Sequence, residues 1–504
     1  GLNPEGMAQA LRGRIAEAGL GLRVAHIEGD NVLPRLVELQ ASHAMSNLDT
    51  GAPLSSWGVQ PMAANAYLGG WGIATALREG ADIVVCGRVT DASLVVGPCA
   101  WWHDWAPDAW NELAGAVVAG HIIECGAHAT GGNFTGFARI PGMLNPGFPI
   151  AEVASDGSCV ITKHAGHGGA VTTDTVTAQL VYEIQGPKYL NPDVTTDLST
   201  VRLRQLDVDR VEVSGAVGSP PPATTKVAVF AQVGWQIAMN TFVTGLDVEA
   251  KVALIEEQIR RLMAGSAIDE LRVTQVGVPA ANPRSQWEST VMVRIMATAR
   301  TREALASLPA KVGSLYLCSV PGFYHDTGAQ PVTGSWPRIE YWPALLPMAA
   351  VDHRVVMDDG RRIPVAPPPH AEMSAQPRHA EPVARAWSGE TRALPLGTIA
   401  YARCGDKGGN SNVGIWASDE RAWPWLRQTL SSATLRELAP DWAQVDIVRH
   451  ELPHLKAVHF VLRGLLGNGG SSNLRIDQVG KAVGEYVLSK TVDIPVELLD
   501  STSR

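Results

Sequence analysis

The sequence predicts an α/β protein: a mostly parallel sheet with covering helices, an α+β extension, and a small C-terminal α+β sandwich. Strand and helix patterns alternate early in the chain, alternating strands replace them in the middle, and a segment rich in Pro, Ala, His and Arg precedes the last part. A chain of 504 residues is also too long for one ordinary hydrophobic core. We therefore expect a large domain at 1–362, divided into an α/β part at about 1–185 and an α+β part at about 186–362, then a linker at 363–395 and a second domain at 396–504.

Two βα units begin the large domain. Leu22 to Ile27 and Ala81 to Cys86 are short apolar runs, each followed by polar residues. Runs that are apolar on both faces fit a parallel sheet between helices, and such sheets bind ligands at the carboxyl ends of their strands. We therefore expect four side chains to share one edge and to contact substrate: Glu28, Asp30, Arg88 and Asp91. Helix capping is an equal alternative for Asp91.

A helical pattern from Asp108 to Cys125 ends at Gly126, which suits a C-cap. A glycine-rich polar loop follows it and contains His128 and the run Gly131-Gly132-Asn133. Glycines leave backbone N–H groups open to a ligand, so this loop either contacts a ligand or forms a structural turn.

A further glycine-rich loop, from Lys163 to Gly169, carries His164 and His167. Two histidines at this spacing can bind a metal ion, and a metal-dependent hydrolase is therefore one alternative function. No third ligand stands at a familiar zinc spacing, so we expect turn histidines and no metal.

The middle of the chain is expected to form antiparallel strands with helices on one face. The strand patterns are Arg210 to Val213, Lys226 to Val233, Gln236 to Thr244, Glu270 to Val276 and Ser289 to Met296. The helical patterns are Val248 to Met263 and Arg302 to Leu308.

The last domain is long enough for a split βαβ sandwich. A first strand ends at Ala402, further strands follow at Val413 to Ala417, Val445 to Arg449 and Ala457 to Leu462, and helices are expected at Glu420 to Leu430 and Gln478 to Leu488. A polar glycine segment, 467–473, should lie near the loop after the first strand.

That loop, Arg403 to Asn412, is the most informative segment of the chain. A thiol, a carboxylate, an ammonium group and three amides or hydroxyls stand among three glycines, a composition that contributes little to a hydrophobic core. Its cations and free backbone N–H groups suit a phosphate, a carboxylate or a developing oxyanion. A structural hairpin is the alternative, and the spacing is not that of a Walker loop.

Composition narrows the range of functions. The net charge of −9, without a long basic run, argues against a nucleic-acid partner. The apolar runs are too short to span a membrane. The six scattered cysteines form neither a disulfide framework nor a zinc ribbon and indicate a reducing cytoplasm.

Several motifs together resemble the acyclic terpene utilisation AtuA family: Gly-Leu-Asn-Pro at 1–4, Glu28-Gly29-Asp30, the run from Gly87 to Ala92, the run from His121 to Gly126 with Gly131 to Phe134, and the run from Cys404 to Asn412. The resemblance covers almost the whole chain. It implies a large AtuA-type domain followed by a ferredoxin-like domain at 396–504. Members normally carry a glycine-rich strand and turn ahead of the Asn-Pro motif, so we expect the chain to lack the extreme N-terminal segment.

The resemblance implies a step in the catabolism of acyclic terpenoids or branched acyl-CoA compounds. It suggests a carbon-carbon lyase that cleaves a branched 3-hydroxyacyl-CoA, or a hydratase, with coenzyme A as part of the substrate and no tightly bound cofactor. Cleavage needs a base and a group that stabilises an enolate. We expect Asp406 or His128 as base, Cys404 or Cys125 as acid or nucleophile, and Lys407 as oxyanion contact. The expected substrate contacts are Gly131, Gly132, Asn133, Gly408, Gly409, Asn410 and Asn412, with Arg88, Asp91, Glu28 and Asp30.

A non-catalytic role is the main alternative. In that case the C-terminal domain would dock an acyl-CoA carboxylase or a related pathway enzyme, and the glycine loops would be interaction turns. We expect a cytoplasmic homo-oligomer that binds a small acyl-CoA, with neither a nucleic-acid nor a membrane partner.

Overall fold

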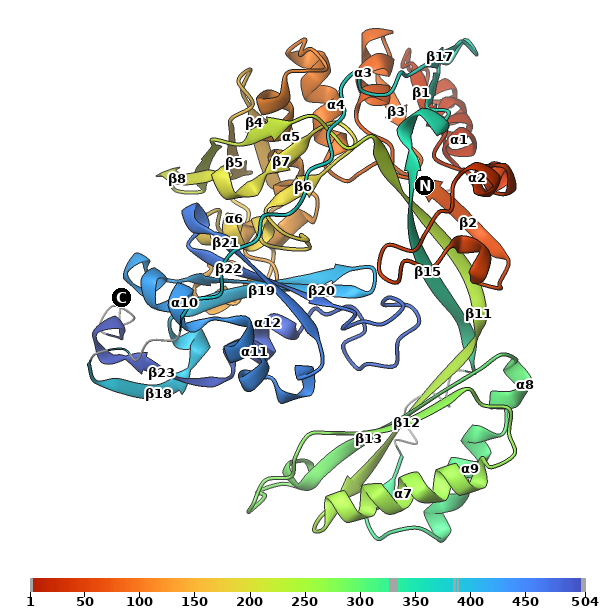
Figure 1. The fold of residues 1–504 in the computed structure, drawn as a ribbon, viewed down its shortest axis with the longest axis vertical. Helices are drawn as coiled ribbons and strands as arrows, with labels where there is room; N and C mark the ends of the chain where they lie inside the picture. The colour runs from red at the N-terminus through yellow and green to blue at the C-terminus, as the bar shows by residue number, and fades with distance from the viewer. Residues whose placement is uncertain (1–2, 326–333, 384–386, 388, 500–504) are drawn as a thin grey trace.

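The computed structural model describes residues 3–325, 334–383, 387 and 389–499. Gly1 and Leu2 of the N-terminal motif, and four positions of the expected linker, lie outside the described residues. The chain forms a body from residues 3–236 and 336–365, an outlying lobe from 237–324, and a C-terminal domain from 389–499 (Figure 1). No helix in the described part of the chain is long and apolar enough to cross a membrane.

The first sheet of the body combines strands from both ends of the large domain. β1 (Val24–Glu28) pairs in parallel with β3 (Ile83–Val85) and antiparallel with β16 (Arg354–Val356), which pairs with β17 (Arg362–Pro364). Helices α1 (Pro4–Glu17) and α3 (Trp71–Arg78) pack against it. The expected parallel pairing is thus found at β1 and β3, whereas the other pairs between named strands of the described chain are antiparallel. The antiparallel partner of β1, β16, comes from a segment far along the chain. The local pattern of residues in a strand does not show which distant strand it pairs with.

The helical layer of the body is centred on α5 (Trp110–Ile123), which is apolar on all sides and almost completely buried. Around it lie α4 (Ser93–Trp102) and α6 (Thr173–Leu180). Two antiparallel sheets complete the layer: β4 (Pro149–Val153), β5 (Cys159–Lys163), β9 (Arg210–Ser214) and β8 (Arg202–Asp207), and β10 (Val217–Ser219), β7 (Thr195–Asp197) and β6 (Lys188–Leu190).

A single long strand, β11 (Thr224–Thr244), connects the body with the lobe (Figure 1). In the body it pairs with β2 (Pro61–Ala66) and β15 (Trp336–Pro347), under α2 (Leu36–Ser42). The sequence predicted two strands here. The register shift between Gln232 and Gly234 accounts for the difference, because a bulge bends a strand without ending it. In the lobe β11 joins β13 (Thr290–Ala299), β12 (Glu270–Val276) and β14 (Phe323–Tyr324), beneath α7 (Val248–Leu262), α8 (Arg302–Leu305) and α9 (Leu308–Ser314).

The C-terminal domain contains the antiparallel sheet β19 (Ala400–Lys407), β20 (Asn410–Ala417), β22 (Ala457–Arg463) and β21 (Asp446–Leu452). Its helices are α10 (Trp423–Thr429), α11 (Ser432–Leu438) and α12 (Val483–Leu488), and β18 (Thr391–Pro395) pairs with β23 (Thr491–Pro495). The last helix begins later than predicted. The Asp477 side chain accepts hydrogen bonds from the N–H groups of Lys481 and Ala482 and holds 477–482 in turns.

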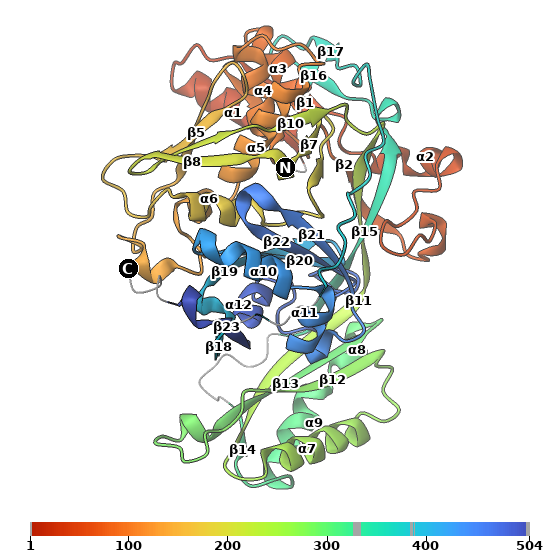
Figure 2. The same cartoon turned by 60° about the vertical axis from the view of Figure 1, so that its left-hand side comes forward.

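The sheet of the C-terminal domain is covered on both faces. One face packs on α10 and α12, and the other packs on α6 of the body; Figure 2 shows the domain between the body and the lobe. Trp416 of β20 belongs to the same hydrophobic cluster as Leu180 of α6, and its Nε1 donates to Asp174 Oδ1 at 3.0 Å. The body and the C-terminal domain therefore share a buried interface.

Candidate functional site

The predicted loop from Arg403 to Asn412 is a β-hairpin. β19 ends at Lys407, the turn is Gly408-Gly409, and β20 begins at Asn410. Because successive side chains of a strand point to opposite faces, Arg403, Gly405 and Lys407 face the body, whereas Cys404 faces the core of the C-terminal domain and Asp406, near the end of the strand, pairs with Lys481. The hairpin thus carries charged groups into the interface between the two domains.

The structure places the loop with Gly131-Gly132-Asn133 directly against β19. Arg403 donates from Nη1 to the Asn133 carbonyl at 3.1 Å, and its Nη2 lies 3.0 Å from His128 Nδ1. Its guanidinium also lies over the Tyr182 ring, 4.6 Å from the centroid. Two of the predicted glycine-rich segments therefore meet at this interface.

His128 is poorly suited to the predicted role of general base. Burial and then the charge of Arg403 lower its pKa to about 4, so the ring is neutral near pH 7 and has little affinity for a proton. A guanidinium only donates, so Nδ1 must present its lone pair to Arg403. We therefore assign His128 to the positioning of Arg403.

A charged network forms the centre of the interface. Lys407 Nζ lies 3.1 Å from Glu183 Oε2, and Lys481 Nζ contacts Glu183 Oε1, Asp406 Oδ1 at 3.0 Å and the Tyr182 hydroxyl at 2.6 Å. Tyr182 and Glu183 follow α6 of the body, whereas the other three residues belong to the C-terminal domain. Two ammonium groups from one domain thus share a single carboxylate from the other.

The network fixes the charges of its members. Burial alone would raise the pKa of Glu183, but Lys407 and hydrogen bonds with Lys481 and Tyr182 outweigh it and lower that pKa to about 2. Burial alone would lower the pKa of Lys407, but Tyr189, Glu183 and Glu124 raise it. Both groups are therefore charged near neutral pH.

Tyr182 stays protonated in these surroundings. Burial and a hydrogen bond with Glu183 raise the pKa of its phenol to about 12, although the hydrogen bond from Lys481 acts to lower that pKa. A neutral phenol beside an ammonium group can give a proton to a substrate and regain it from that group.

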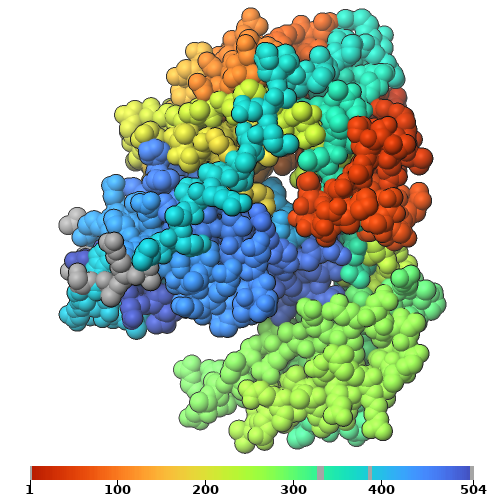
Figure 3. All heavy atoms as spheres, in the orientation of Figure 1, coloured from red at the N-terminus to blue at the C-terminus, as the bar shows by residue number. Residues whose placement is uncertain are grey.

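The tip of the hairpin reaches the body. The Asn410 side chain donates to Asp49 Oδ1 at 3.0 Å, and a Cβ at Gly408 would contact Tyr341 of β15. The segment 467–473 lies beside the turn, as expected, because Leu466 N–H donates to the Gly409 carbonyl at 2.9 Å. Figure 3 shows a hollow in the surface between the C-terminal domain (blue) and the N-terminal part of the chain (red).

Arg88 and Asp91 also lie on this side of the body. They form an ion pair at 2.8 Å, and Arg88 Cζ lies 4.8 Å from the centroid of the Tyr67 ring. Burial raises the pKa of Tyr67 overall, and the charges of Arg88 and Lys407 both act against that rise. This pair is therefore within electrostatic range of the network.

Glu28 and Asp30 lie in other networks. Glu28 contacts His26 at 3.3 Å and Arg362 at 3.7 Å on the first sheet. Asp30 is buried, and its Oδ2 accepts from Asn65 at 2.9 Å and from the Arg88 N–H at 2.8 Å. Asp30 thus holds the turn that carries Arg88. Among the described contacts, the carboxylates of Glu28 and Asp30 do not touch the hairpin.

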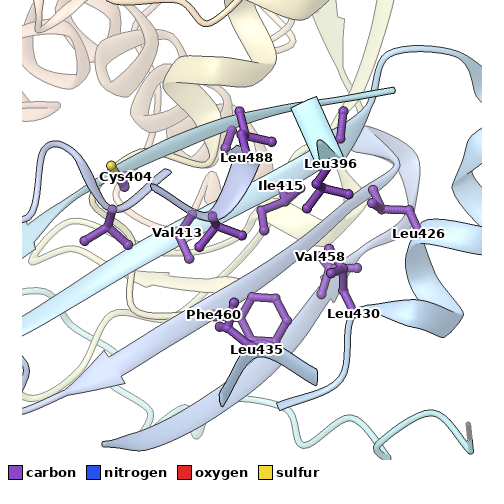
Figure 4. Close-up of a cluster of buried hydrophobic side chains, with 14 of the residues drawn as sticks. Leu396, Cys404, Val413, Ile415, Leu426, Leu430, Leu435, Val458, Phe460 and Leu488 are labelled. Atoms are coloured by element: carbon purple, nitrogen blue, oxygen red, sulfur yellow. The ribbon is translucent and has the colours of Figure 1, made fainter. Parts of the chain in front are cut away.

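Cys404 lies at one end of the hydrophobic cluster of the C-terminal domain, which also contains Val413 and Leu488 (Figure 4). Its Sγ accepts from the Gly484 N–H at 3.0 Å, and burial raises the pKa of the thiol to about 11. A protonated, enclosed thiol is a weak nucleophile. The surroundings of Cys404 thus favour packing over the predicted catalysis, and burial also raises the pKa of Cys125.

Several predicted ligand contacts are already occupied within the protein. The Gly131 and Gly132 N–H groups donate to the carbonyls of His128 and Ala127, so neither amide is open to an oxyanion. Asn412 is fully buried, and its Nδ2 donates to the Val181 carbonyl at 2.9 Å at the end of α6. These groups hold the loop and the interface together.

His164 and His167 face each other on a turn, with their ring centroids 5.9 Å apart. Within the described residues, no three His, Cys, Asp or Glu side chains come together in a way that could hold a metal ion. The metal-dependent hydrolase stays an alternative prediction that rests on this histidine pair alone.

The comparisons with known proteins identify the family. A family model described as acyclic terpene utilisation family protein AtuA matches residues 1–357. The chain belongs to this AtuA family. A second model, the AtuA ferredoxin-like domain, matches residues 394–493. No curated protein and no solved structure matches the chain.

Of the five residues in the network of this AtuA-family chain, two were predicted from the sequence and three were not. Asp406 and Lys407 stand in the conspicuous glycine-rich segment, whereas Tyr182, Glu183 and Lys481 stand in unexceptional surroundings. Lys481 lies within a segment that was expected to be helical, Gln478 to Leu488, and Glu183 simply follows a helix. Only the docking of the two domains joins them.

Proposed function

We propose that this AtuA-family chain is an enzyme of acyclic terpenoid or branched acyl-CoA catabolism that cleaves a carbon-carbon bond in a CoA thioester. Family membership supports the pathway. The observation that carries the chemistry is the convergence of Asp406, Lys407 and Lys481 with Tyr182 and Glu183 between the two domains.

The reaction that these groups suit is the retro-aldol cleavage of a 3-hydroxyacyl thioester. Asp406, whose side chain is 30% exposed, takes the proton of the substrate hydroxyl. The oxygen then forms a carbonyl, the adjacent carbon-carbon bond breaks, and its electron pair moves onto the thioester as an enolate.

The remaining groups stabilise and discharge that enolate. Lys407, held in its charged form by Glu183, stabilises the negative oxygen. Tyr182 gives its proton to the enolate carbon and receives a proton from Lys481. Lys481 in turn receives the proton that Asp406 took from the substrate hydroxyl. Both products leave without an added oxidant, reductant or water.

A hydratase is the second use of the same groups, with Asp406 activating a water molecule and Lys407 again stabilising the enolate. Product masses separate the two reactions, because cleavage yields two smaller molecules whereas hydration or dehydration changes the mass by one water.

To test this proposal, the full chain is incubated with branched 3-hydroxyacyl-CoA thioesters, and the products are identified by mass spectrometry. We expect Asp406→Asn and Lys407→Ala to abolish turnover, and Lys456→Ala to retain it. Lys456 is the matched control because it forms an ion pair with the well-exposed Glu420 of the same domain. Thermal unfolding followed by circular dichroism establishes that each variant is folded.

Retained turnover in both site variants would refute the assignment of the residues. Absence of both turnover and binding for every thioester in the panel would instead favour a partner subunit or scaffold.

A further inference from the structure

A strap without helix or strand crosses from the body to the C-terminal domain. It consists of residues 366–383, a part of the expected linker that begins just after β17. Figure 1 shows it running along the body towards α10, and Figure 3 shows its atoms, in teal, on the outer surface. Because it forms no backbone ladder of its own, its position depends on a few side-chain contacts.

On the body, one side chain of the strap binds the backbone of Lys188, the first residue of β6. Gln376 Oε1 accepts from the Lys188 N–H at 3.0 Å, and Gln376 Nε2 donates to the Lys188 carbonyl at 2.6 Å. A Cβ at Gly186 would overlap Gln376 Oε1, so this close approach requires a glycine. The strap thus fixes one end of the connection between α6 and β6, which carries Tyr182 and Glu183.

That connection holds a strained residue of the site. Glu183 has a left-handed backbone, with φ at 52°, which is uncommon for a residue other than glycine and persists only where the surroundings hold it. From this conformation its carboxylate meets Lys407 and Lys481. The strap therefore supports the geometry of the charged network from outside.

On the C-terminal domain, the strap is held at two places. Glu381 accepts from the Ser432 N–H at 3.0 Å and from the Ser432 hydroxyl at 2.6 Å, at the start of α11. The His379 ring lies edge-on to His450 of β21, with the ring centroids 6.0 Å apart. The strap thus bridges the two domains that together form the network.

The histidines beneath the strap are incompletely bonded. His450 is 2% exposed, and its cross-strand neighbour in β22 is His459. The Nδ1 atoms of His379, His450 and His459 are buried without a hydrogen-bond partner in the described part of the chain. A buried polar atom without a partner costs free energy that contact with water returns. The closed strap is therefore poised to open.

The surroundings of His450 disfavour its charged form. Burial, then the nearby His379, lower the pKa of His450 to about 4, and Arg463 of β22 acts in the same direction, whereas a hydrogen bond with the Pro377 carbonyl raises it. Burial, then His450, lower the pKa of His459 to about 3. Each imidazole is thus neutral while the strap is closed.

The neighbouring charged groups are engaged elsewhere. Glu451, the next residue of β21, bonds to Arg449 at 2.8 Å, and the Lys188 ammonium pairs with Asp197 at 2.8 Å. Among the described residues, no carboxylate forms an ion pair with His450. A proton on this ring is better accommodated in water, so acid favours the open strap.

We propose that the strap is a clamp that closes the body onto the C-terminal domain, that Gln376 is a positioning residue for Glu183, and that acidification opens the clamp. The clamp acts whichever reaction takes place at the interface, so hydrogen exchange tests it without turnover. Only an effect on turnover rests on the proposed function.

Hydrogen–deuterium exchange followed by mass spectrometry measures the opening at pH 7.5. In Gln376→Met, which loses both hydrogen bonds to Lys188, residues 183–190 and β21 should exchange about tenfold faster or more. Glu381→Leu should have the same effect around Lys188, which Glu381 does not touch, because releasing one end of a clamp frees the other. Met373→Ala is the matched control and should change nothing, since Met373 is 77% exposed on the same strap.

The extent of the change decides the outcome. Faster exchange that stays confined to the partner of each substituted residue would mean two local contacts and would overturn the clamp, as would unchanged exchange in both variants. Under the proposed function, Gln376→Met should also lower turnover about tenfold, because Glu183 is displaced. If exchange changes as expected but the unmodified chain turns over no thioester, the clamp stands and the proposed function fails.

The pH dependence tests the histidines. The closed strap holds the pKa of His450 at about 4, and an exposed imidazole has the ordinary value of 6.5, so opening takes up a proton. Closure is complete above pH 6.5 and weakens as the pH falls towards 4. Between pH 7.5 and 5.5 the open fraction should rise about tenfold, after correction for the intrinsic exchange rate.

His450→Gln supplies the control for this effect. Glutamine can still donate to the Pro377 carbonyl but does not titrate, so the acid-induced rise should largely disappear. An equal rise in His450→Gln, or no rise in the unmodified chain, would refute opening by acid.

Discussion

Removing the shared carboxylate of Glu183 should destabilise the protein in a pH-dependent way. The pKa of Glu183 falls from an ordinary value of 4.5 to about 2 in the folded protein, and its side chain is only 19% exposed. Since one pKa unit corresponds to about 1.4 kcal/mol, Glu183→Gln should lower the free energy of unfolding by about 3 kcal/mol at pH 6. A similar figure, about 3–5 kcal/mol, is typical when one partner of a buried ion pair is removed.

The sign of the pH dependence follows from the lowered pKa. The stabilisation is complete above the unfolded pKa of 4.5 and is lost as the pH falls towards 2, so at pH 3 the difference between the unmodified chain and Glu183→Gln should be about half that at pH 6. Urea unfolding followed by tryptophan fluorescence measures both differences.

The matched control for this prediction is Glu152→Gln. Glu152 pairs with Arg210 at the surface, where its side chain is 50% exposed, and such pairs contribute at most about 1 kcal/mol. A Glu183→Gln effect that is no larger than the control, or that is the same at pH 6 and pH 3, would contradict the assigned network.

Three further outcomes are expected. Cys404→Ala should retain turnover. It should lower the free energy of unfolding, measured in urea, by about 1–2 kcal/mol, because the Gly484 N–H loses its acceptor. A folded Cys404→Ala variant without turnover would instead indicate a catalytic role for Cys404. Gly405→Ala should reduce turnover and stability, because the added Cβ would overlap the side chains of Glu183 and Tyr182. The control Gly13→Ala lies in open space on α1 and should stabilise the chain by about 0.5–1 kcal/mol. Equal effects of the two substitutions in thermal unfolding would count against the close approach at Gly405. Arg403→Lys should lower turnover more than Arg421→Lys, since only Arg403 bridges His128 and the Asn133 carbonyl; indistinguishable rates would remove Arg403 from the site.

Local patterns were sufficient for most individual elements of the fold. Glu270 to Val276 was predicted as a strand and is β12, and Ala457 to Leu462 is β22 with one residue added. The alternation of apolar and polar side chains is a local property that one strand carries by itself. Strand pairing is a property of two segments, and for that reason β16, more than 300 residues after β1, could not be anticipated as its partner.

The candidate site shows the same contrast between what one local segment encodes and what depends on two distant segments. The hairpin was visible because glycines and charged groups are crowded there without a hydrophobic pattern. Glu183 could not be selected, since an acidic residue after a helix is ordinary, and its lowered pKa arises only when two lysines approach it. Cys404 illustrates the opposite error: its position in a conspicuous segment suggested chemistry, whereas strand alternation directs its thiol into the core.

The balance of charges at the interface bears on how an acidic protein would attract the proposed CoA thioester. The chain has a net charge of −9, which by itself repels anions. Lys407 and Lys481 are balanced by Glu183 and Asp406, and Arg88 by Asp91, so these groups nearly cancel. Arg403 is different, since it donates to His128 and to the Asn133 carbonyl and forms no ion pair among the described residues. Because an interaction between charges is stronger in a partly buried site than in water, this unpaired guanidinium can outweigh the distant negative surface.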